Sequence, residues 1–362
     1  MPRNFRLLIW QCLLRLSKKM CYNAVEDMNR KRKIKMPIDA VVAVTYRCNS
    51  RCVMCDIWQI KDFPELPVAA YSKLPKSLRD INISGGEPFL RTDLVEIVQT
   101  IKRACPKAKI NISTNGFLVE TIKQVLPKIK KICPNIAVSV SVDGIGQMHE
   151  TVRRVPNAWH KALETIRFCR DHLKIKNIKL AFTLNNLNCH HLRLAYEWSR
   201  RLGVQFTMAV AHSSKIYFGK ENRLETAAHL LKKEFSSVIA DLLASLKPKD
   251  WVRAYFVDGL LKISTGQKRP LESYAGEDFF YLDPKGDVYP SVIDNVIMGN
   301  INDTKNFSEL WHSRKAQKAR DEIKGFESNY WMVCTARTAI KRNPLKVANW
   351  IFKNKFSLKQ WQ

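Results

Sequence analysis

The chain has 362 residues, a net charge of +28 and a pI of about 9.8. Hydrophobic residues make up 46% and charged residues 26%, with 13 glycines and 15 prolines, which excludes a disordered or collagen-like chain. No apolar run reaches the ~18 residues of a membrane-spanning helix. The length predicts two domains, or one large α/β domain with an appendage.

The N-terminal end of the sequence is strongly basic. Residues 1–36 contain ten basic and two acidic residues, and the segment 5–16 reads as a short apolar helix flanked by Arg and Lys. No small-residue cleavage site follows it, so we do not interpret it as a signal peptide. A helix of this kind lies on an anionic membrane surface or docks on the protein core.

From residue 38 the pattern alternates between strands and helices. Strands are predicted at 41–45, 80–83, 109–113, 136–142, 178–183 and 205–210, and helices at 68–78, 92–104, 117–131, 157–172 and 190–202. This alternation predicts a parallel sheet with helices outside. The strands read as nearly continuous apolar runs, as expected when both faces are buried. In such folds the chemistry lies at the carboxyl ends of the strands.

The first predicted strand is followed by three cysteines in eight residues. Cys48, Cys52 and Cys55 have the spacing C-x3-C-x2-C. Three thiolates on one loop can hold three irons of a [4Fe–4S] cluster and leave the fourth iron open. A structural zinc site normally has four protein ligands, and no fourth Cys or His is nearby. We therefore interpret this loop as an iron–sulfur site.

Polar turns follow the next strands as well. The second strand leads into Gly85, Gly86, Glu87 and Pro88. The third leads to Asn115, and the fourth contains Ser141 and leads to Asp143. Each turn alone is common, but their succession at one edge of a sheet predicts a shared site.

With these motifs the sequence resembles the radical S-adenosylmethionine (SAM) superfamily over roughly residues 38–210. The resemblance implies a partial (β/α)6 barrel, a [4Fe–4S] cluster on the three cysteines, and SAM bound to the open iron. It also implies a set of SAM-binding residues: Gly85, Gly86, Glu87, Pro88, Asn115, Ser141, Asp143 and Arg153. The family often has an aromatic residue before the third cysteine, whereas this chain has Met54.

The same resemblance implies an activity. Reductive cleavage of SAM gives a 5′-deoxyadenosyl radical that abstracts hydrogen from a substrate C–H bond. The electron comes from an external one-electron reductant such as flavodoxin or ferredoxin. The protein's task is to bind, orient and shield the reactants.

The C-terminal third resembles the SPASM-type extension of many radical SAM enzymes. Residues 223–265 read as helical, and Asp-Pro-Lys-Gly at 283–286 predicts a hairpin. The family pattern would have cysteines at Ser273 and Ser291, and only Cys334 remains. We therefore predict a SPASM-like fold without its auxiliary cluster. Cys189 and Cys334 are then candidate hydrogen donors to the product radical, although each can also be a buried core thiol.

The end of the sequence is basic again, with seven basic and no acidic residues in 337–362. A helix is predicted to begin at Pro344. Leu345, Ala348, Ile351 and Phe352 share a face of it, and Trp350 and Trp361 suit a membrane interface. The segment is predicted to attach to anionic lipid or to pack on the barrel.

We divide the chain into a basic amphipathic N-terminal helix (1–36), a partial barrel (37–225), a helical linker with a degenerate SPASM-like domain (226–335), and a basic amphipathic tail (336–362). The fold class is α/β. Ten mostly scattered cysteines suit a reducing cytoplasm, with the protein attached to the inner face of the membrane.

Three functions are compatible with these observations. The first is a radical SAM enzyme acting on a lipid, a lipid-linked saccharide or an envelope precursor at an anionic membrane surface. The second is a peptide- or RNA-modifying enzyme of the same chemistry, although nucleic acid is disfavoured as a partner because no RNA-binding module is apparent. The third is a non-catalytic Fe–S scaffold.

Overall fold

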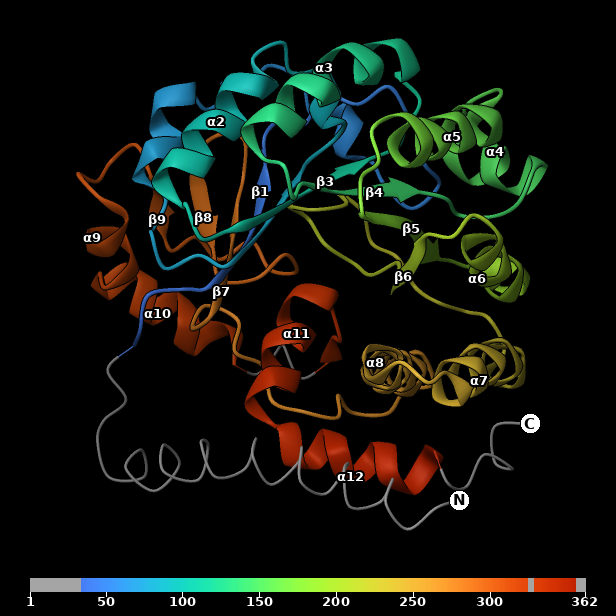
Figure 1. Cartoon of the computed structure of the whole chain (residues 1–362). Helices are drawn as coiled ribbons and strands as arrows, with labels where there is room; N and C mark the ends of the chain where they lie inside the picture. The colour runs from blue at the N-terminus through green and yellow to red at the C-terminus, as the bar shows by residue number, and fades with distance from the viewer. Residues whose placement is uncertain (1–33, 325–328, 356–362) are drawn as a thin grey trace.

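The computed structural model describes residues 34–324 and 329–355, and Figure 1 shows their arrangement. The helix predicted at 5–16 and the tryptophan at position 361 lie outside the described residues. In the described part of the chain, no helix combines the length and the apolar character needed to cross a membrane.

The strands of the described residues form one sheet, in the order β6-β5-β4-β3-β2-β1-β7-β8-β9. Neighbouring strands from β6 to β7 are parallel, and the last two pairs are antiparallel. This is the unclosed sheet of a partial barrel, as the sequence predicted. The strands are β1 (Asp39–Ala43), β2 (Asp80–Ser84), β3 (Lys109–Thr114), β4 (Ala137–Ser141), β5 (Asn177–Leu184), β6 (Gln205–Val210), β7 (Phe279–Leu282), β8 (Asp287–Tyr289) and β9 (Gly299–Asn300).

The first helices lie along the outer side of the sheet (Figure 1). In α2, for example, Leu94, Ile97, Val98 and Ile101 are buried, at the 3–4 residue spacing of an amphipathic helix. The outer helices are α2 (Leu94–Ala104), α3 (Val119–Ile132), α4 (Gln147–Arg153), α5 (Ala158–Arg167) and α6 (Leu192–Arg201). A π-helix, η4 (Phe168–His172), continues α5, and short 3-10 helices are η1 (Ile57–Gln59), η3 (Pro88–Leu90) and η5 (Cys189–His191).

The helix predicted at 68–78 is shorter and of another kind. It is a 3-10 helix, η2 (Val68–Lys73), and Leu74 is already extended with ψ 142°. Pro75 follows, and a proline disfavours the helical conformation of the residue before it. The helical stretch at 223–265 is likewise divided into α7 (Ala228–Ala244) and α8 (Pro248–Ser264), because proline is well suited to begin a helix and cannot continue one.

The C-terminal third joins the barrel sheet directly. β7 pairs in parallel with β1, from Asp39 opposite Phe279 to Val42 opposite Leu282, and β7–β8 is the predicted hairpin. The remaining helices are α9 (Phe307–Trp311), α10 (Arg314–Ile323), α11 (Val333–Arg342) and α12 (Pro344–Lys355). The domain boundary proposed near 225 stays a prediction, although one sheet crosses it.

The prediction that the strands are apolar on both faces is wrong for β3 and β5. Their residues alternate between buried and partly exposed along the strand. The buried residues are Ile, Leu, Phe and one Thr, and the other face carries Lys, Asn, Ser, Ala and Thr. The physical reason is that only the outer face is covered by helices, whereas the inner face borders a cavity.

Candidate functional site

A cavity of about 720 Å³ lies against the inner face of the sheet. This is within the range of ~300–1,000 Å³ usual for small-molecule sites. Cys48, Cys52 and Cys55 all line it, from the loop after β1. Of the predicted SAM-binding residues, five also line the cavity: Gly85, Gly86, Asn115, Ser141 and Arg153. The other three, Glu87, Pro88 and Asp143, are not among its lining residues.

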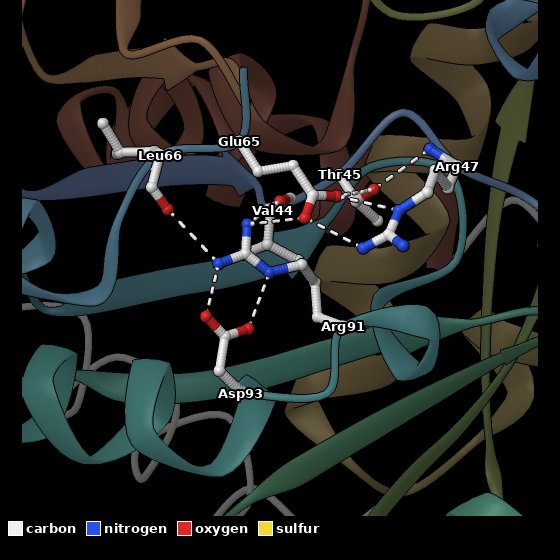
Figure 2. Close-up of polar contacts among 7 residues, drawn as sticks. All are labelled: Val44, Thr45, Arg47, Glu65, Leu66, Arg91 and Asp93. Atoms are coloured by element: carbon white, nitrogen blue, oxygen red, sulfur yellow. Dashed lines mark hydrogen bonds and ion pairs between the residues drawn. The ribbon is translucent and has the colours of Figure 1, made fainter. Parts of the chain in front are cut away.

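The residues that precede the first cysteine take part in a network of hydrogen bonds and ion pairs, which Figure 2 shows. Glu65 accepts hydrogen bonds from the Thr45 hydroxyl (2.6 Å) and from Arg47 (2.8 and 3.0 Å). Arg91 is buried and donates to the carbonyls of Val44 (3.0 Å) and Leu66 (3.2 Å).

The Arg91 guanidinium also forms a bidentate ion pair with the Asp93 carboxylate, and each of its two hydrogen bonds is 2.7 Å long. Arg91 comes from the segment after Pro88. The network therefore ties the start of the cysteine loop to Arg91 and Asp93, which follow the Gly-Gly-Glu-Pro segment in the sequence (Figure 2).

Gly85 and Gly86 lie against the backbone that precedes the cysteines. A Cβ on Gly86 would lie 2.2 Å from the Arg47 carbonyl oxygen, and one on Gly85 would lie 2.3 Å from that of Thr45. Gly85 also has φ +126°, which favours glycine. The Gly86 and Glu87 amides donate to the Thr45 and Arg47 carbonyls, at 2.8 and 2.9 Å. The glycines thus let two loops pack together at the cavity wall.

Glu87 is fully buried and its carboxylate is directed to the end of β3. It accepts bonds from the Asn115 amide (2.7 Å), the Thr114 hydroxyl (2.8 Å) and the Phe89 amide (3.2 Å). Burial raises the pKa of Glu87 to about 7, and these hydrogen bonds oppose that rise. The carboxylate therefore joins the β2 and β3 turns, and its predicted contact with the SAM amino group stays a prediction.

Arg153 brings a positive charge to the cysteine loop. One of its nitrogens lies 3.5 Å from the Cys52 sulfur, and another pairs with Asp143 at 2.6 Å. Asp143 is fully buried and also accepts a bond from the Thr183 amide at 2.7 Å. Burial raises the pKa of Asp143, while Arg153 opposes the rise. This pair connects the ends of β4 and β5 with the loop that carries Cys52.

The three thiols fit an iron–sulfur cluster better than a single metal ion. In the described residues, no three His, Cys, Asp or Glu side chains converge to hold one ion. A cluster does not require that, since each thiolate binds a different iron. Burial raises the pKa of Cys48 and Cys55 to about 12, so cluster assembly must release their protons. The nearby Arg153 cation favours a negatively charged ligand set.

Further cavity-lining residues were missed by the sequence reasoning. Tyr217 and Phe218 follow β6, and Met54 packs with Phe218 in a small apolar cluster beside the cysteines. Met54 thus occupies the apolar position where the family often has an aromatic residue. Lys179 and Asn111 line the cavity from mid-strand positions. The alternation of polar residues along β3 and β5 was the signal that could have revealed them.

The two candidate hydrogen donors differ in position. Cys334 lines the cavity at the start of α11 and is buried, whereas Cys189 lies in the main hydrophobic core and is not a lining residue. Serines stand at the two positions where the family pattern would have cysteines. The Ser273 hydroxyl accepts a hydrogen bond from the Ala275 backbone amide (3.2 Å), and the Ser291 hydroxyl accepts one from the Ile293 backbone amide (3.1 Å). Such bonds stabilise local turns.

Two family models match this chain. Residues 42–193 match the radical SAM superfamily, and residues 274–336 match SPASM, described as an iron–sulfur cluster-binding domain. Residues 42–193 of this chain therefore form a radical SAM domain. The protein is an enzyme whose cofactors are a [4Fe–4S] cluster and SAM. The SPASM match contains a single cysteine, Cys334, so the absence of an auxiliary cluster stays a prediction.

Relatives of this radical SAM enzyme carry different names. It is 28% identical over 305 residues to pre-heme d1 synthase of Dinoroseobacter shibae. That alignment covers 74% of this chain and 71% of the synthase. It is 37% identical over 90 residues to a probable GTP 3′,8-cyclase of Methanococcus maripaludis, which covers 23% of this chain. That alignment spans only 30% of the cyclase.

Solved structures share the fold at low sequence identity. The structure of Streptococcus suis SuiB bound to S-adenosylmethionine has a TM-score of 0.56 and 13% identity, and covers 79% of this chain and 68% of SuiB. The structure of anSMEcpe with bound AdoMet and the Kp18Cys peptide has a TM-score of 0.54 and 18% identity, and covers 78% and 82%. These likenesses concern the radical SAM fold alone.

Proposed function

We propose that this radical SAM enzyme abstracts hydrogen from the polar part of an envelope precursor or lipid-linked saccharide at the inner face of an anionic membrane. The observation that carries the proposal is the polar inner face of the sheet. Asn82, Asn111, Ser113, Ser139 and Lys179 all line the cavity below the cysteine loop.

A polar cavity of this kind favours a saccharide or head group over an acyl chain. These side chains bond one another, but donors that they do not use, such as the remaining N–H groups of Lys179, still need partners. A hydrocarbon placed against them would leave those donors unsatisfied, at a cost of about 1–3 kcal/mol for each group. An oxygen-rich substrate replaces the lost water with hydrogen bonds. The acyl portion of a lipid-linked substrate would therefore remain outside the cavity.

The proposed membrane contact is supported by α12. Leu345 and Phe352 are both 63% exposed, and Lys346 and Lys353 flank them. Such a combination is typical of helices that lie on anionic lipid. Two parts of the sequence prediction need correction. Trp350 was expected at the lipid interface but packs edge-on against Tyr255 of α8, with ring centroids 5.3 Å apart.

Ile351 was expected to share the exposed face of α12, and it packs against the core instead. The reason is that one face of α12 packs against α7 and α8. Residues at the 3–4 spacing of a helix share that face: Val347, Trp350, Ile351 and Asn354. The exposed face is therefore narrower than the sequence alone suggested.

The chain's own residues divide the work of the reaction. When bound, the cluster and SAM supply reductive bond cleavage and hydrogen abstraction from a C–H bond. The two-glycine segment and the Arg153–Asp143 pair support the walls around the cysteine loop. Cys334, at the cavity wall, is the better placed of the two proposed hydrogen donors. An external one-electron reductant, such as flavodoxin or ferredoxin, is proposed as the partner.

Flotation with liposomes tests the location. The reconstituted full-length enzyme is mixed anaerobically with vesicles of phosphatidylglycerol or of phosphatidylcholine. We expect flotation with the anionic vesicles only, and a clear loss of flotation in the double variant L345S/F352S. The matched control is L194S, which removes an exposed leucine of α6. Equal flotation of the double variant and wild type, or none of the wild type, would contradict the membrane contact through α12.

Incubation with SAM, reductant and a membrane extract tests the substrate class. We expect 5′-deoxyadenosine to increase when the polar, saccharide-containing fraction is added, because the substrate triggers productive cleavage. A response to a peptide or RNA fraction instead would favour the alternative enzyme functions. Iron bound without any 5′-deoxyadenosine formation under all conditions would favour the scaffold.

A further inference from the structure

The inner face of the sheet carries a hydrogen-bonded polar network that no cofactor role explains. Asn111 donates from its amide to the Asn82 side-chain oxygen at 2.6 Å, and the Ser113 hydroxyl donates to the same oxygen at 2.9 Å. The Asn111 oxygen in turn accepts from Ser139 (2.9 Å) and from the Lys179 ammonium (3.0 Å). All five residues line the cavity. The network therefore presents fixed polar groups to a ligand.

The Lys179 end of this network lies away from the carboxyl edge of the sheet, where the cysteine loop is. Lys179 precedes Thr183, near the carboxyl end of β5, by four residues, which corresponds to about 13 Å along a strand. The lower end of the cavity is completed by Lys109 at the start of β3, Lys249 of α8 and Arg337 of α11. We call this lower end, lined by Lys109, Asn111, Lys179, Lys249 and Arg337, the cavity floor.

Positive charge at the floor exceeds the available carboxylates. Arg337 pairs with Asp39 at 2.7 Å and with Asp80 at 3.3 Å, and Lys341 also pairs with Asp80. Both acidic groups are thus already engaged.

In the part of the chain that the structure describes, Lys109, Lys179 and Lys249 form no ion pair. Three lysines consequently remain to balance a ligand's charge.

The surroundings of Lys179 make its positive charge costly in the absence of a ligand. Burial is the main cause that lowers its pKa to about 8, with Arg337 and Arg253 contributing to the decrease and Asp80 opposing it. Its hydrogen-bond acceptor, Asn111, is neutral. An anion at the floor would replace lost hydration and offset the repulsion of Lys179 by Arg337 and Arg253.

We propose that the cavity floor binds a phosphate group of the substrate through Lys179, assisted by Lys109, Lys249 and Asn111. The identity of the rest of the substrate rests on the proposed function. A phosphate dianion matches the partly buried Lys179 and the exposed Lys109 and Lys249, which have no ion-pair partner among the described residues, better than a single carboxylate does. Bound there, it would anchor one end of the substrate about 13 Å below the carboxyl edge of the sheet, so that the other end reaches the cysteine loop.

Competitive acetylation of the reconstituted full-length enzyme tests the site without measuring turnover. The protein is treated anaerobically with trace acetic anhydride, and modification of each lysine is measured by mass spectrometry. Lys131, exposed on the outer helix α3, is the internal control. The labelling of Lys179 is followed relative to that of Lys131. Millimolar inorganic phosphate should slow modification of Lys179 about tenfold and leave Lys131 unchanged.

Binding of phosphate by calorimetry gives a second, independent readout. We expect K179Q to bind inorganic phosphate about tenfold more weakly, because a charge-assisted hydrogen bond is lost, and K131Q to bind as the wild type does. Near-ultraviolet circular dichroism confirms that both variants are folded. If neither labelling nor binding at Lys179 responds to phosphate, or if succinate protects as well as phosphate, the proposal is overturned.

Vesicles distinguish the sources of the phosphate. Protection of Lys179 by phosphate but not by phosphatidylglycerol vesicles supports a soluble phosphate group, and protection by both supports a lipid head group. The flotation result is separate from this test. If the enzyme does not float with vesicles but phosphate still protects Lys179, only the proposed membrane contact is contradicted. If the enzyme floats but phosphate does not protect Lys179, only the proposed phosphate site is contradicted.

Discussion

The two ends of the cavity are built in different ways. At the cysteine end, loops meet one another, and backbone bonds from Gly86 and Glu87 to the cysteine loop fix the wall. At the floor, mid-strand side chains such as Asn111 and Lys179 meet because the strands are in register. Sequence motifs describe the first end, since each of its loops carries its own functional residues within a short segment. Register describes the second, whose residues come from separate strands.

The largest expected effect comes from breaking the cysteine end. C52S should lose the cluster, because a neutral hydroxyl is a poor ligand for iron, and SAM cleavage should fall by about a thousandfold or more. Iron content and 5′-deoxyadenosine formation measure this. The control is C133A, which removes a buried thiol at the end of α3. About four irons per wild-type chain are expected, and about eight would contradict the absence of an auxiliary cluster.

A smaller effect is expected from G86A. The added Cβ would clash with the Arg47 carbonyl, so the two loops must separate, at a cost of about 1–3 kcal/mol of folding free energy together with reduced cluster content. Denaturant unfolding of the apoprotein and iron content of the reconstituted protein give the two values. G203A is the comparison variant: its Cβ meets open space, but its φ of +66° strains an alanine, so it shows the backbone cost without a steric clash and should leave the iron content unchanged. An unchanged iron content in G86A would show that the packing of the loops does not position the cysteines.

The ion-pair network behind the cysteine loop should matter less for chemistry than for stability. Arg91 also pairs with Glu65 at 3.4 Å. R91M therefore leaves two backbone carbonyls and the Glu65 and Asp93 carboxylates with fewer partners, so we expect about 2 kcal/mol of destabilisation. K123M removes the ion pairs of a more exposed lysine with Glu120 and Glu164 and should destabilise the fold much less, because solvent screens such pairs. An equal loss of unfolding free energy in R91M and K123M would contradict a specific stabilising role for Arg91.

The smallest predicted effect is the pH dependence of anion binding at the floor. The pKa of Lys179 is lowered to about 8 by burial, with Arg337 and Arg253 adding to the shift and Asp80 opposing it. An anion binds the protonated amine and raises that pKa. The affinity of the enzyme for the anion should therefore be highest below about pH 8, where Lys179 is protonated. It should decline as the pH rises through the higher pKa that Lys179 has when the anion is bound.

Titration calorimetry with sulfate, whose own charge is constant in this range, measures the effect without interference from phosphate ionisation. We expect about a tenfold loss of affinity from neutral to alkaline pH, which is largely absent in K179Q. A pH profile that is the same in K179Q and wild type would assign the titration to another group.

Both the fold and the cysteine end could be predicted from local sequence. Six strands alternating with helices require a parallel sheet with crossovers, and Cys48, Cys52 and Cys55 are close enough to share one cluster wherever their loop lies. The α12 helix was predicted from Pro344, but which of its faces would be covered was not. Local periodicity shows that a helix has two faces, and only the neighbouring helices select the buried one.

What the sequence by itself determined was chemistry carried by neighbouring residues: the iron–sulfur loop, the glycines beside it and the alternation of elements. Tertiary structure decided which distant groups meet. It turned Glu87 toward β3, joined β7 to β1, and brought Lys179 and Arg337 to one cavity floor. The physical reason is that strand register and helix docking depend on the sum of many weak contacts across the whole chain, and no short segment contains that sum.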